Sequence, residues 1–208
     1  MIMTRVKVCG ITRIEDGVAA ARLGVDAIGF VFYPLSPRYV QAERARDIAA
    51  AIPPFVSSVG LFVNADAAKV LEVLCTTRLD FLQFHGEESP EYCAQFGVPF
   101  LKAIRVKPGV DLLQYATSFS SAKALLLDAY VGGAYGGTGQ GFDWRLIPAN
   151  LPLPVILSGG LGPDNVAAAV RTVRPWAVDV SSGVEAAKGI KDAEKIERFM
   201  RGARNADV

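Results

Sequence analysis

The stretch Arg5-Val6-Lys7-Val8-Cys9-Gly10-Ile11-Thr12, near the N-terminus, decides how the rest of the chain is interpreted. Val6 and Val8 are β-branched residues, which favour a strand. Successive side chains of a strand point to opposite faces, so Lys7 and Cys9, two residues apart, face the same side. The stretch therefore predicts a short strand that carries an ammonium group and a thiol on one face.

A loop and a helix are expected after this strand. Gly10 ends the strand, and Thr12 is expected to cap the next helix, with Glu15 at the capping-box spacing. Residues 14–23 carry apolar side chains at helical spacing and are followed by Gly24, which suits the end of a helix. The thiol of Cys9 is thus expected where a buried strand opens into the loop before a helix.

The same alternation of strand and helix continues to the C-terminus. It indicates a parallel sheet, and eight such units indicate closure into a (β/α)8 barrel, the TIM barrel. We therefore expect an α/β fold in which residues 1–208 form a single domain. The helix at 67–75 is expected to bury Val70, Leu71 and Leu74. The expected strands are 5–9, 26–32, 56–63, 81–84, 100–106, 124–127, 154–157 and 177–180, and the expected helices are 14–23, 41–51, 67–75, 90–95, 110–119, 163–173 and 192–204.

Composition excludes several classes of protein. Hydrophobic residues make up 51% of the 208 residues and charged residues 21%, as in a globular domain. The net charge of +1 provides no basic surface for nucleic acid or a membrane, so an anionic ligand must be held locally. Three cysteines without a CxxC motif indicate neither a disulfide framework nor a zinc site. No signal peptide or membrane span is apparent, and we expect a cytoplasmic protein.

Two glycine-containing turns follow the seventh and eighth strands. Functional residues of a TIM barrel lie at the C-terminal ends of the strands, and phosphate is commonly bound after strands seven and eight. Backbone N–H groups of Gly159, Gly160, Ser182 and Gly183, with Ser181 beside them, can converge on an anion. The alternative is that these residues only permit tight turns. Both turns together on adjacent strands favour a phosphate site.

Cys9 and Asp128 are the candidate catalytic pair. Asp128 ends an apolar strand, where partial desolvation favours the protonated acid, and capping of a loop is its alternative role. For Cys9 the alternative is a small buried hydrophobic residue. Strands one and six lie across the barrel mouth, so the two side chains are expected to flank one ligand. That placement suits a base and an acid that act on different atoms of a small substrate.

Arg38, His85 and Asp179 complete the candidate set. The guanidinium fork of Arg38 can hold a carboxylate through two hydrogen bonds, although the residue could instead be a solvated loop arginine. His85, the single histidine, cannot form a multi-histidine metal site, and we place it with the substrate-binding residues, with a structural role as the alternative. Asp179 is expected to pair with Lys7 on the neighbouring strand.

With these residues identified, the chain resembles the phosphoribosylanthranilate isomerase family. The resemblance extends over nearly the whole chain in order, which is more specific than any single motif. The matching segments are Lys7-Val8-Cys9-Gly10-Ile11-Thr12, Gly29-Phe30-Val31-Phe32, Ser36-Pro37-Arg38, Gly60-Leu61-Phe62-Val63-Asn64, Leu82-Gln83-Phe84-His85-Gly86, Leu127-Asp128, Gly136-Gly137-Thr138-Gly139, Leu157-Ser158-Gly159-Gly160-Leu161 and Asp179-Val180-Ser181-Ser182-Gly183-Val184-Glu185.

The resemblance implies an isomerase that converts N-(5-phosphoribosyl)anthranilate into 1-(2-carboxyphenylamino)-1-deoxyribulose 5-phosphate by an acid/base-catalysed Amadori rearrangement in tryptophan biosynthesis. It implies that Asp128 is the general acid, that Cys9 is the general base and that Arg38 engages the anthranilate carboxylate. The thiolate is the active form of a cysteine base, and we expect Lys7 to assist it. The resemblance requires no metal or organic cofactor, and it leaves a monomer or a homodimer open.

Other interpretations remain open at this point. A different phosphosugar barrel, such as a synthase or an epimerase, can use the same phosphate site. A non-catalytic barrel that binds a phosphorylated ligand would keep the glycine turns and need neither Cys9 nor Asp128. Within the glycine-rich stretch 132–141, the loop with Gly136 to Gly141 is expected to close over the substrate and exclude water.

Overall fold

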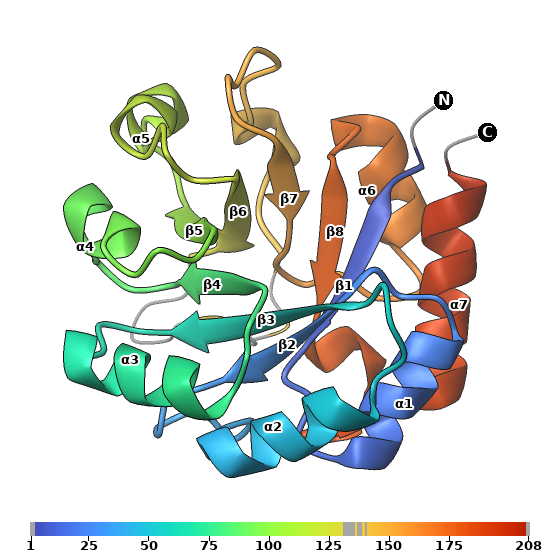
Figure 1. Ribbon diagram of the computed structural model, residues 1–208. Coiled ribbons are helices and arrows are strands. Elements are labelled where there is room, and N and C mark those ends of the chain that lie inside the picture. Colours follow the sequence, from blue (N-terminus) through green and yellow to red (C-terminus); the bar gives the residue numbers. More distant parts are fainter. Residues whose placement is uncertain (1–2, 131–135, 137–138, 140, 207–208) are drawn as a thin grey trace.

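Eight parallel strands form a closed barrel in the computed structural model, which describes residues 3–130, 136, 139 and 141–206. Each strand pairs with its neighbours in chain order, and β1 pairs with β8 to close the barrel (Figure 1). The predicted (β/α)8 barrel is therefore confirmed. The strands are β1 (Arg5–Cys9), β2 (Ala27–Val31), β3 (Ser57–Phe62), β4 (Phe81–Phe84), β5 (Phe100–Val106), β6 (Ala124–Ala129), β7 (Val155–Leu157) and β8 (Ala177–Val180).

Helices surround the barrel and cover the outer faces of its strands (Figure 1). Between β6 and β7 the described residues contain no α-helix, and the single-turn 3-10 helix η1 (Trp144–Leu146) lies in its place. After β8 come a second 3-10 turn, η2 (Ser182–Val184), and a small hairpin of β9 (Glu185–Ala187) and β10 (Ile190–Lys191). The α-helices are α1 (Ile14–Arg22), α2 (Ala42–Ala51), α3 (Ala67–Thr76), α4 (Pro90–Ala94), α5 (Leu112–Ser118), α6 (Val166–Val173) and α7 (Ala193–Asn205).

The alternation of side chains along each strand divides the apolar residues between two cores. On β6, Ala124 and Leu126 point into the barrel, where they pack with Val59. Leu125 and Leu127 point outward into the larger core between the barrel and its helices. Asp128 is two residues after Leu126 and therefore also points inward. Its carboxyl group thus lies inside the barrel at the C-terminal end of β6. The same alternation places Lys7 and Cys9 inside the barrel at β1.

Two local expectations were wrong. Thr12 does not cap α1, because the N-terminal cap is Arg13 without a side-chain hydrogen bond, and the Thr12 hydroxyl instead donates to the carbonyl of Gly189. Leu71 is half exposed, and Val73 takes its place on the buried face of α3 beside Val70. The first error has a tertiary cause, because the β9–β10 hairpin reaches the loop after β1.

No described helix is long and apolar enough to cross a membrane.

Candidate active site

A small cavity at the C-terminal mouth of the barrel brings the predicted residues together. It has a volume of about 50 Å³ and is lined by Cys9 from β1, Arg38 from the loop after β2, and His85 from the end of β4. Asp128 from β6 and Ser181 from the end of β8 line it as well. Residues separated by up to 172 positions in sequence thus face one space, as expected for a TIM barrel.

Cys9 is buried at the end of β1, beside a strand position that only glycine can occupy. A Cβ atom at Gly29 would lie 2.8 Å from the Cys9 sulfur and 3.2 Å from Cε of Lys7, so the two side chains fill this space. Burial raises the pKa of the Cys9 thiol, and Asp179 adds to the increase, whereas Lys7 and Lys191 oppose it. The thiol form is therefore favoured, and the two nearby ammonium groups offset part of the cost of forming the thiolate.

Lys7 and Asp179 form a buried ion pair under Cys9. The two residues are direct partners in the β1–β8 register, and Nζ of Lys7 donates to Oδ1 of Asp179 at 2.8 Å. Burial alone would lower the pKa of Lys7, but the charges of Asp179 and Cys9 outweigh burial and raise it. Lys7 is thus a fixed positive charge beside the thiol, and the predicted pair is present.

Asp128 is buried across the barrel mouth from Cys9. Its Oδ1 accepts a hydrogen bond from the backbone N–H of Ala129 at 2.8 Å, which fixes the carboxyl group. Its Oδ2 lies 3.2 Å from Nε2 of His85, without the alignment of a hydrogen bond. The side-chain amide of Gln83 lies 3.2 Å from Nδ1 of the same imidazole. The side-chain nitrogen of Gln83 has only donors, so in this contact it faces Nδ1 of His85 as the donor.

Arg38 is buried at the edge of the cavity, and its fork already has a carboxylate partner within the chain. Nε donates to Oε1 of Glu185 at 2.7 Å and Nη2 donates to Oε2 at 2.8 Å. The second N–H of Nη2 and both N–H groups of Nη1 make no hydrogen bond to another described residue, and they are the donors a ligand can use.

The turns after β7 and β8 adjoin this cavity, and both are restricted to glycine at key positions. Gly159 and Gly160 have left-handed φ angles of +84° and +63°. A Cβ atom at Gly183 would lie 2.0 Å from the carbonyl oxygen of Leu161, so no side chain fits there. A pocket of about 20 Å³ between the turns shares Asp128 and three other residues with the first cavity: Ser158, Asp179 and Ser181.

Backbone donors are available in these turns. The N–H groups of Gly160, Ser182 and Gly183 donate no backbone hydrogen bond to another described residue. The φ angles and the absence of side chains leave the N–H groups of both turns accessible to an anion. An open pocket of about 460 Å³ continues outward from here, lined by Gly160, Ser182 and Gly183 among others. The structure thus brings both glycine turns to one edge of the cavity.

The glycine-rich stretch is described in part. Gly136, Gly139 and Gly141 are placed, and the other residues between 132 and 140 lie outside the described residues. A Cβ atom at Gly136 would lie 3.2 Å from Oδ2 of Asp128, so the loop after β6 reaches the acid.

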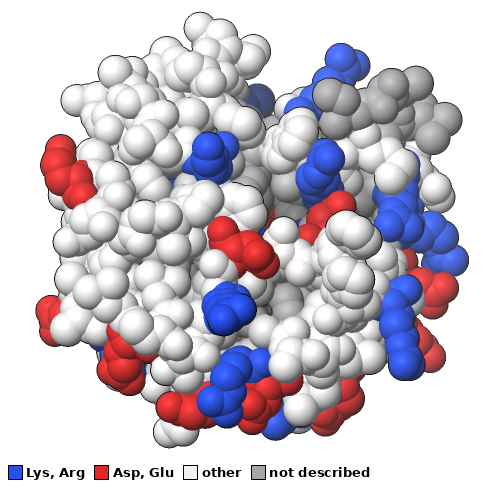
Figure 2. All heavy atoms as spheres, viewed as in Figure 1, with Lys and Arg blue, Asp and Glu red and all other residues white. Residues whose placement is uncertain are grey.

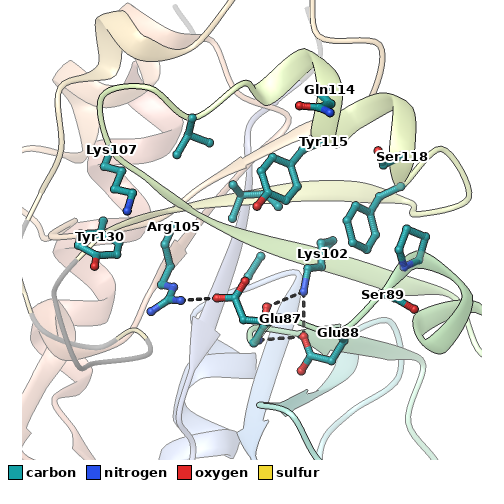
Figure 3. A pocket seen from close by; sticks show the side chains of 16 residues that line it. Glu87, Glu88, Ser89, Lys102, Arg105, Lys107, Gln114, Tyr115, Ser118 and Tyr130 are labelled. Atoms are coloured by element: carbon teal, nitrogen blue, oxygen red, sulfur yellow. Dashed lines mark hydrogen bonds and ion pairs between the residues drawn. The ribbon is translucent and has the colours of Figure 1, made fainter.

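A larger groove of about 540 Å³ lies outside the barrel, between the end of β5 and α5 (Figure 3). Its charged groups are already paired: Lys102 donates to Glu88 at 2.8 Å, and Arg105 donates to Glu87. Lys107 lies over the ring of Tyr130. Neither Cys9 nor Asp128 lines this groove, so we place the site in the smaller cavity.

Figure 2 shows basic and acidic side chains interspersed over the visible face of the molecule.

Three residues of the site were not anticipated: Gln83, Glu185 and Lys191. Gln83 could have been found, because it lies two positions before His85 and therefore on the same face of β4. Glu185 ends one of the recognised segments but had no role assigned. Lys191 has no signal in the sequence, since only the β9–β10 pairing, in which Lys191 faces Glu185, brings it to the site.

Comparison with known proteins gives one consistent result. The family model described as N-(5'phosphoribosyl)anthranilate (PRA) isomerase matches residues 6–202. The N-(5'-phosphoribosyl)anthranilate isomerase of Thiobacillus denitrificans is 62% identical over 200 residues, which cover 96% of this chain and 98% of that protein.

Two solved structures are similar over the whole barrel. A phosphoribosyl anthranilate isomerase in complex with reduced 1-(o-carboxyphenylamino)-1-deoxyribulose 5-phosphate has a TM-score of 0.87 and 42% identity, covering 98% of this chain and 100% of that chain. A monomeric form of the dimeric enzyme from Thermotoga maritima has a TM-score of 0.85 and 40% identity over the same fractions.

Proposed function

Because the chain belongs to the N-(5'-phosphoribosyl)anthranilate isomerase family, we propose that Cys9 and Asp128 carry the base and acid steps of that reaction. The reaction converts N-(5-phosphoribosyl)anthranilate into 1-(2-carboxyphenylamino)-1-deoxyribulose 5-phosphate in tryptophan biosynthesis. The single observation that carries the proposal is the placement of the two side chains, which project from β1 and β6 into one cavity next to the glycine turns.

The acid step opens the ribose ring. Asp128 in its protonated form donates its proton to the ring oxygen, the bond between that oxygen and C1 breaks, and the aryl nitrogen supplies the electron pair that forms a Schiff base. The contact of Oδ1 with the N–H of Ala129 leaves Oδ2 directed toward the cavity side, next to His85. General acid or base catalysis by one positioned group contributes about 10²–10⁴-fold in rate.

The base step moves the double bond. The thiolate of Cys9 takes the proton from C2, and the electrons of the C2–H bond form a C1–C2 double bond while the Schiff base nitrogen becomes neutral. The resulting enolamine loses the proton of its C2 hydroxyl group and gains one at C1, which yields the ketone. No atom is gained or lost overall. Lys7 and Lys191 stabilise the thiolate through their charges, against the effect of burial and of Asp179.

The remaining predicted residues bind the two charged ends of the substrate. The turns with Gly159, Gly160, Ser182 and Gly183 hold the 5-phosphate, because their backbone donors face a pocket that adjoins the catalytic one. Arg38 holds the anthranilate carboxylate at the opposite edge. Ser181 joins the turn after β8 to the end of β1, since its hydroxyl donates to the carbonyl of Cys9 at 3.0 Å. The molecule thus offers an anion site on each side of the acid and the base.

The experiment that tests the function is turnover of phosphoribosylanthranilate, generated in situ because it is labile, by the purified chain. We expect isomerisation to the aminodeoxyribulose product. Binding of the reduced product, the ligand in one similar structure, is measured in parallel by calorimetry. A folded protein that binds this ligand and does not turn over the substrate would refute the proposal and support the alternative, a barrel that only binds phosphorylated ligands.

We also infer that the chain forms a homodimer in the cytoplasm. A similar enzyme is described as dimeric. Three large apolar side chains are exposed just before strand starts, and hence at the same end of the barrel: Met3 before β1, Phe55 before β3 and Trp176 before β8. Phe55 is fully exposed. Burial of this group between two copies would remove apolar surface from water. Light scattering across a concentration series tests the assignment, and a monomer at all concentrations would contradict it.

A further inference from the structure

We propose that Glu185 is a positioning residue that aims Arg38 at the ring carboxylate of the substrate. The inference rests on the proposed role of Arg38 and assigns a role to Glu185 of the β9–β10 hairpin, from which the chemistry above uses only Lys191.

The contact between Glu185 and Arg38 leaves the guanidinium group little freedom. Two parallel hydrogen bonds of 2.7 and 2.8 Å join Nε and Nη2 to the two carboxylate oxygens, and both side chains are more than nine-tenths buried. Paired bonds of this kind fix the plane of the group as well as its position. Arg38 therefore presents one defined edge to the cavity.

The edge that remains is suited to a second carboxylate. An arginine side chain has five N–H donors, and Glu185 takes the two on the Nε side. The outer pair, on Nη1 and Nη2, forms another fork of the same geometry. Glu185 thus blocks one fork and leaves the other, so the orientation of Arg38 does not have to be created when the substrate binds.

The stem of Arg38 is fixed as well as its head. A Cβ atom at Gly10 would lie 2.5 Å from Cδ and 3.2 Å from Cβ of Arg38, so the arginine chain crosses directly over the backbone of Gly10. Gly10 follows Cys9 and has a φ of +76°. The position of the arginine is therefore tied to the loop that carries the proposed base.

The hairpin holds Glu185 from the other side. Nζ of Lys191 donates to Oε1 of Glu185 at 2.9 Å and to the carbonyl of Ser181 at 3.0 Å. Burial would raise the pKa of Glu185, but Arg38 and Lys191 outweigh burial and lower it, so the carboxylate stays ionised at neutral pH. The carboxylate bonds to both of these buried cations, and its removal would take away the negative charge that compensates them.

The test compares two ligands that differ in one group. The first is the reduced product with its ring carboxylate, and the second is the corresponding anilino compound without it. We expect the parent to bind the first ligand more tightly, by about ten- to a hundredfold, as for a charge-assisted hydrogen-bonded pair. In Glu185→Gln the preference is expected to fall about tenfold, through weaker binding of the carboxylate ligand alone.

Two further variants separate positioning from general damage. Glu185→Asp keeps the charge that offsets Arg38 and Lys191 but shortens the side chain, and we expect an intermediate preference. In an Arg38→Met background, where the preference is already lost, Glu185→Gln is expected to have no further effect. Glu72→Gln serves as the matched control, because Glu72 pairs with Lys69 on the exposed surface of α3.

Equal weakening of both ligands in the Glu185 variants, or an unchanged preference, would overturn the proposal. So would a parent that does not distinguish the two ligands, because Arg38 would then not hold the carboxylate. Circular dichroism confirms that each variant is folded before binding is measured. Absence of turnover by the parent is a separate result, since it would refute the isomerase function while the ligand preference remains measurable.

Discussion

Replacement of Lys7 by Met would affect both roles of the buried pair with Asp179, the support of the fold and the support of the Cys9 thiolate. Methionine has a similar length and no charge, so the variant leaves the carboxylate of Asp179 buried without its 2.8 Å partner. It also removes the ammonium group that opposes the increase in the pKa of Cys9. We expect both a less stable protein and a smaller fraction of Cys9 thiolate at neutral pH.

The magnitude follows from the burial of both side chains. Removal of one partner of a buried ion pair costs about 3–5 kcal/mol. A chain of this size loses about 2–4 °C of melting temperature per kcal/mol, so the expected decrease is about 6–20 °C. The raised pKa of Lys7 means that its contribution is complete below the unfolded value of about 10.4 and is lost only as the pH rises through the folded value. The full effect is therefore present at pH 7.

Activity gives the second part of the prediction. Loss of the Lys7 charge raises the pKa of Cys9 further, so the rise of kcat/KM with pH moves to higher pH. Each unit of increase lowers the thiolate fraction at neutral pH about tenfold. The assay is the pH profile of kcat/KM for Lys7→Met beside the parent, with thermal melting by circular dichroism.

A double variant separates the two effects. Lys7→Met combined with Asp179→Leu removes both charges, and an apolar replacement of a buried pair is often neutral or stabilising. We expect the melting temperature to recover most of its loss while activity remains below that of the parent. Unchanged stability and an unchanged pH profile in the single variant would refute the reasoning, because the pair would then support neither the fold nor the thiolate.

Three other predictions concern the rim of the barrel. Asp128→Asn keeps the shape of the acid without its proton, and we expect kcat to fall about 10²–10⁴-fold in a steady-state assay. Retention of parental kcat would contradict the acid role. Gly159→Ala places a Cβ atom 2.7 Å from the backbone nitrogen of Ala129 at a φ of +84°, so we expect a raised KM, and an unchanged KM would argue against a phosphate site in this turn. Phe55→Ser is expected to shift a dimer toward monomer in light scattering, with catalysis of the monomer as the control; an unchanged mass would exclude Phe55 from the interface.

The barrel itself could be predicted from the sequence because each strand has a local signature. The outer-facing and inner-facing residues of β6 are both apolar, and such a continuous run is typical of a strand that is covered on both faces. The limits 81–84, 100–106 and 177–180 agree with β4, β5 and β8. The position of Asp128 at the mouth followed from its place at the C-terminal end of this apolar run.

Contacts between distant segments could not be predicted in this way. Thr12 matches a capping pattern, yet its hydroxyl bonds to Gly189, 177 positions away. Arg38 was expected to meet a substrate carboxylate, and the structure adds an internal one, Glu185, 147 positions away. Both contacts depend on the short β9–β10 hairpin, whose strands have three and two residues and no periodicity to detect. The strands of the barrel can thus be predicted from short stretches of sequence. The contacts that hold the site residues in place join distant segments and are seen only in the folded structure.

The measurement that tests the central claim most directly is turnover of phosphoribosylanthranilate by the parent, Cys9→Ala and Asp128→Ala, each also titrated with the reduced product. We expect turnover by the parent, a loss of at least about a hundredfold in both variants, and continued binding of the ligand by all three proteins. Substantial turnover by either folded variant would contradict the assignment of the base and the acid to these two side chains.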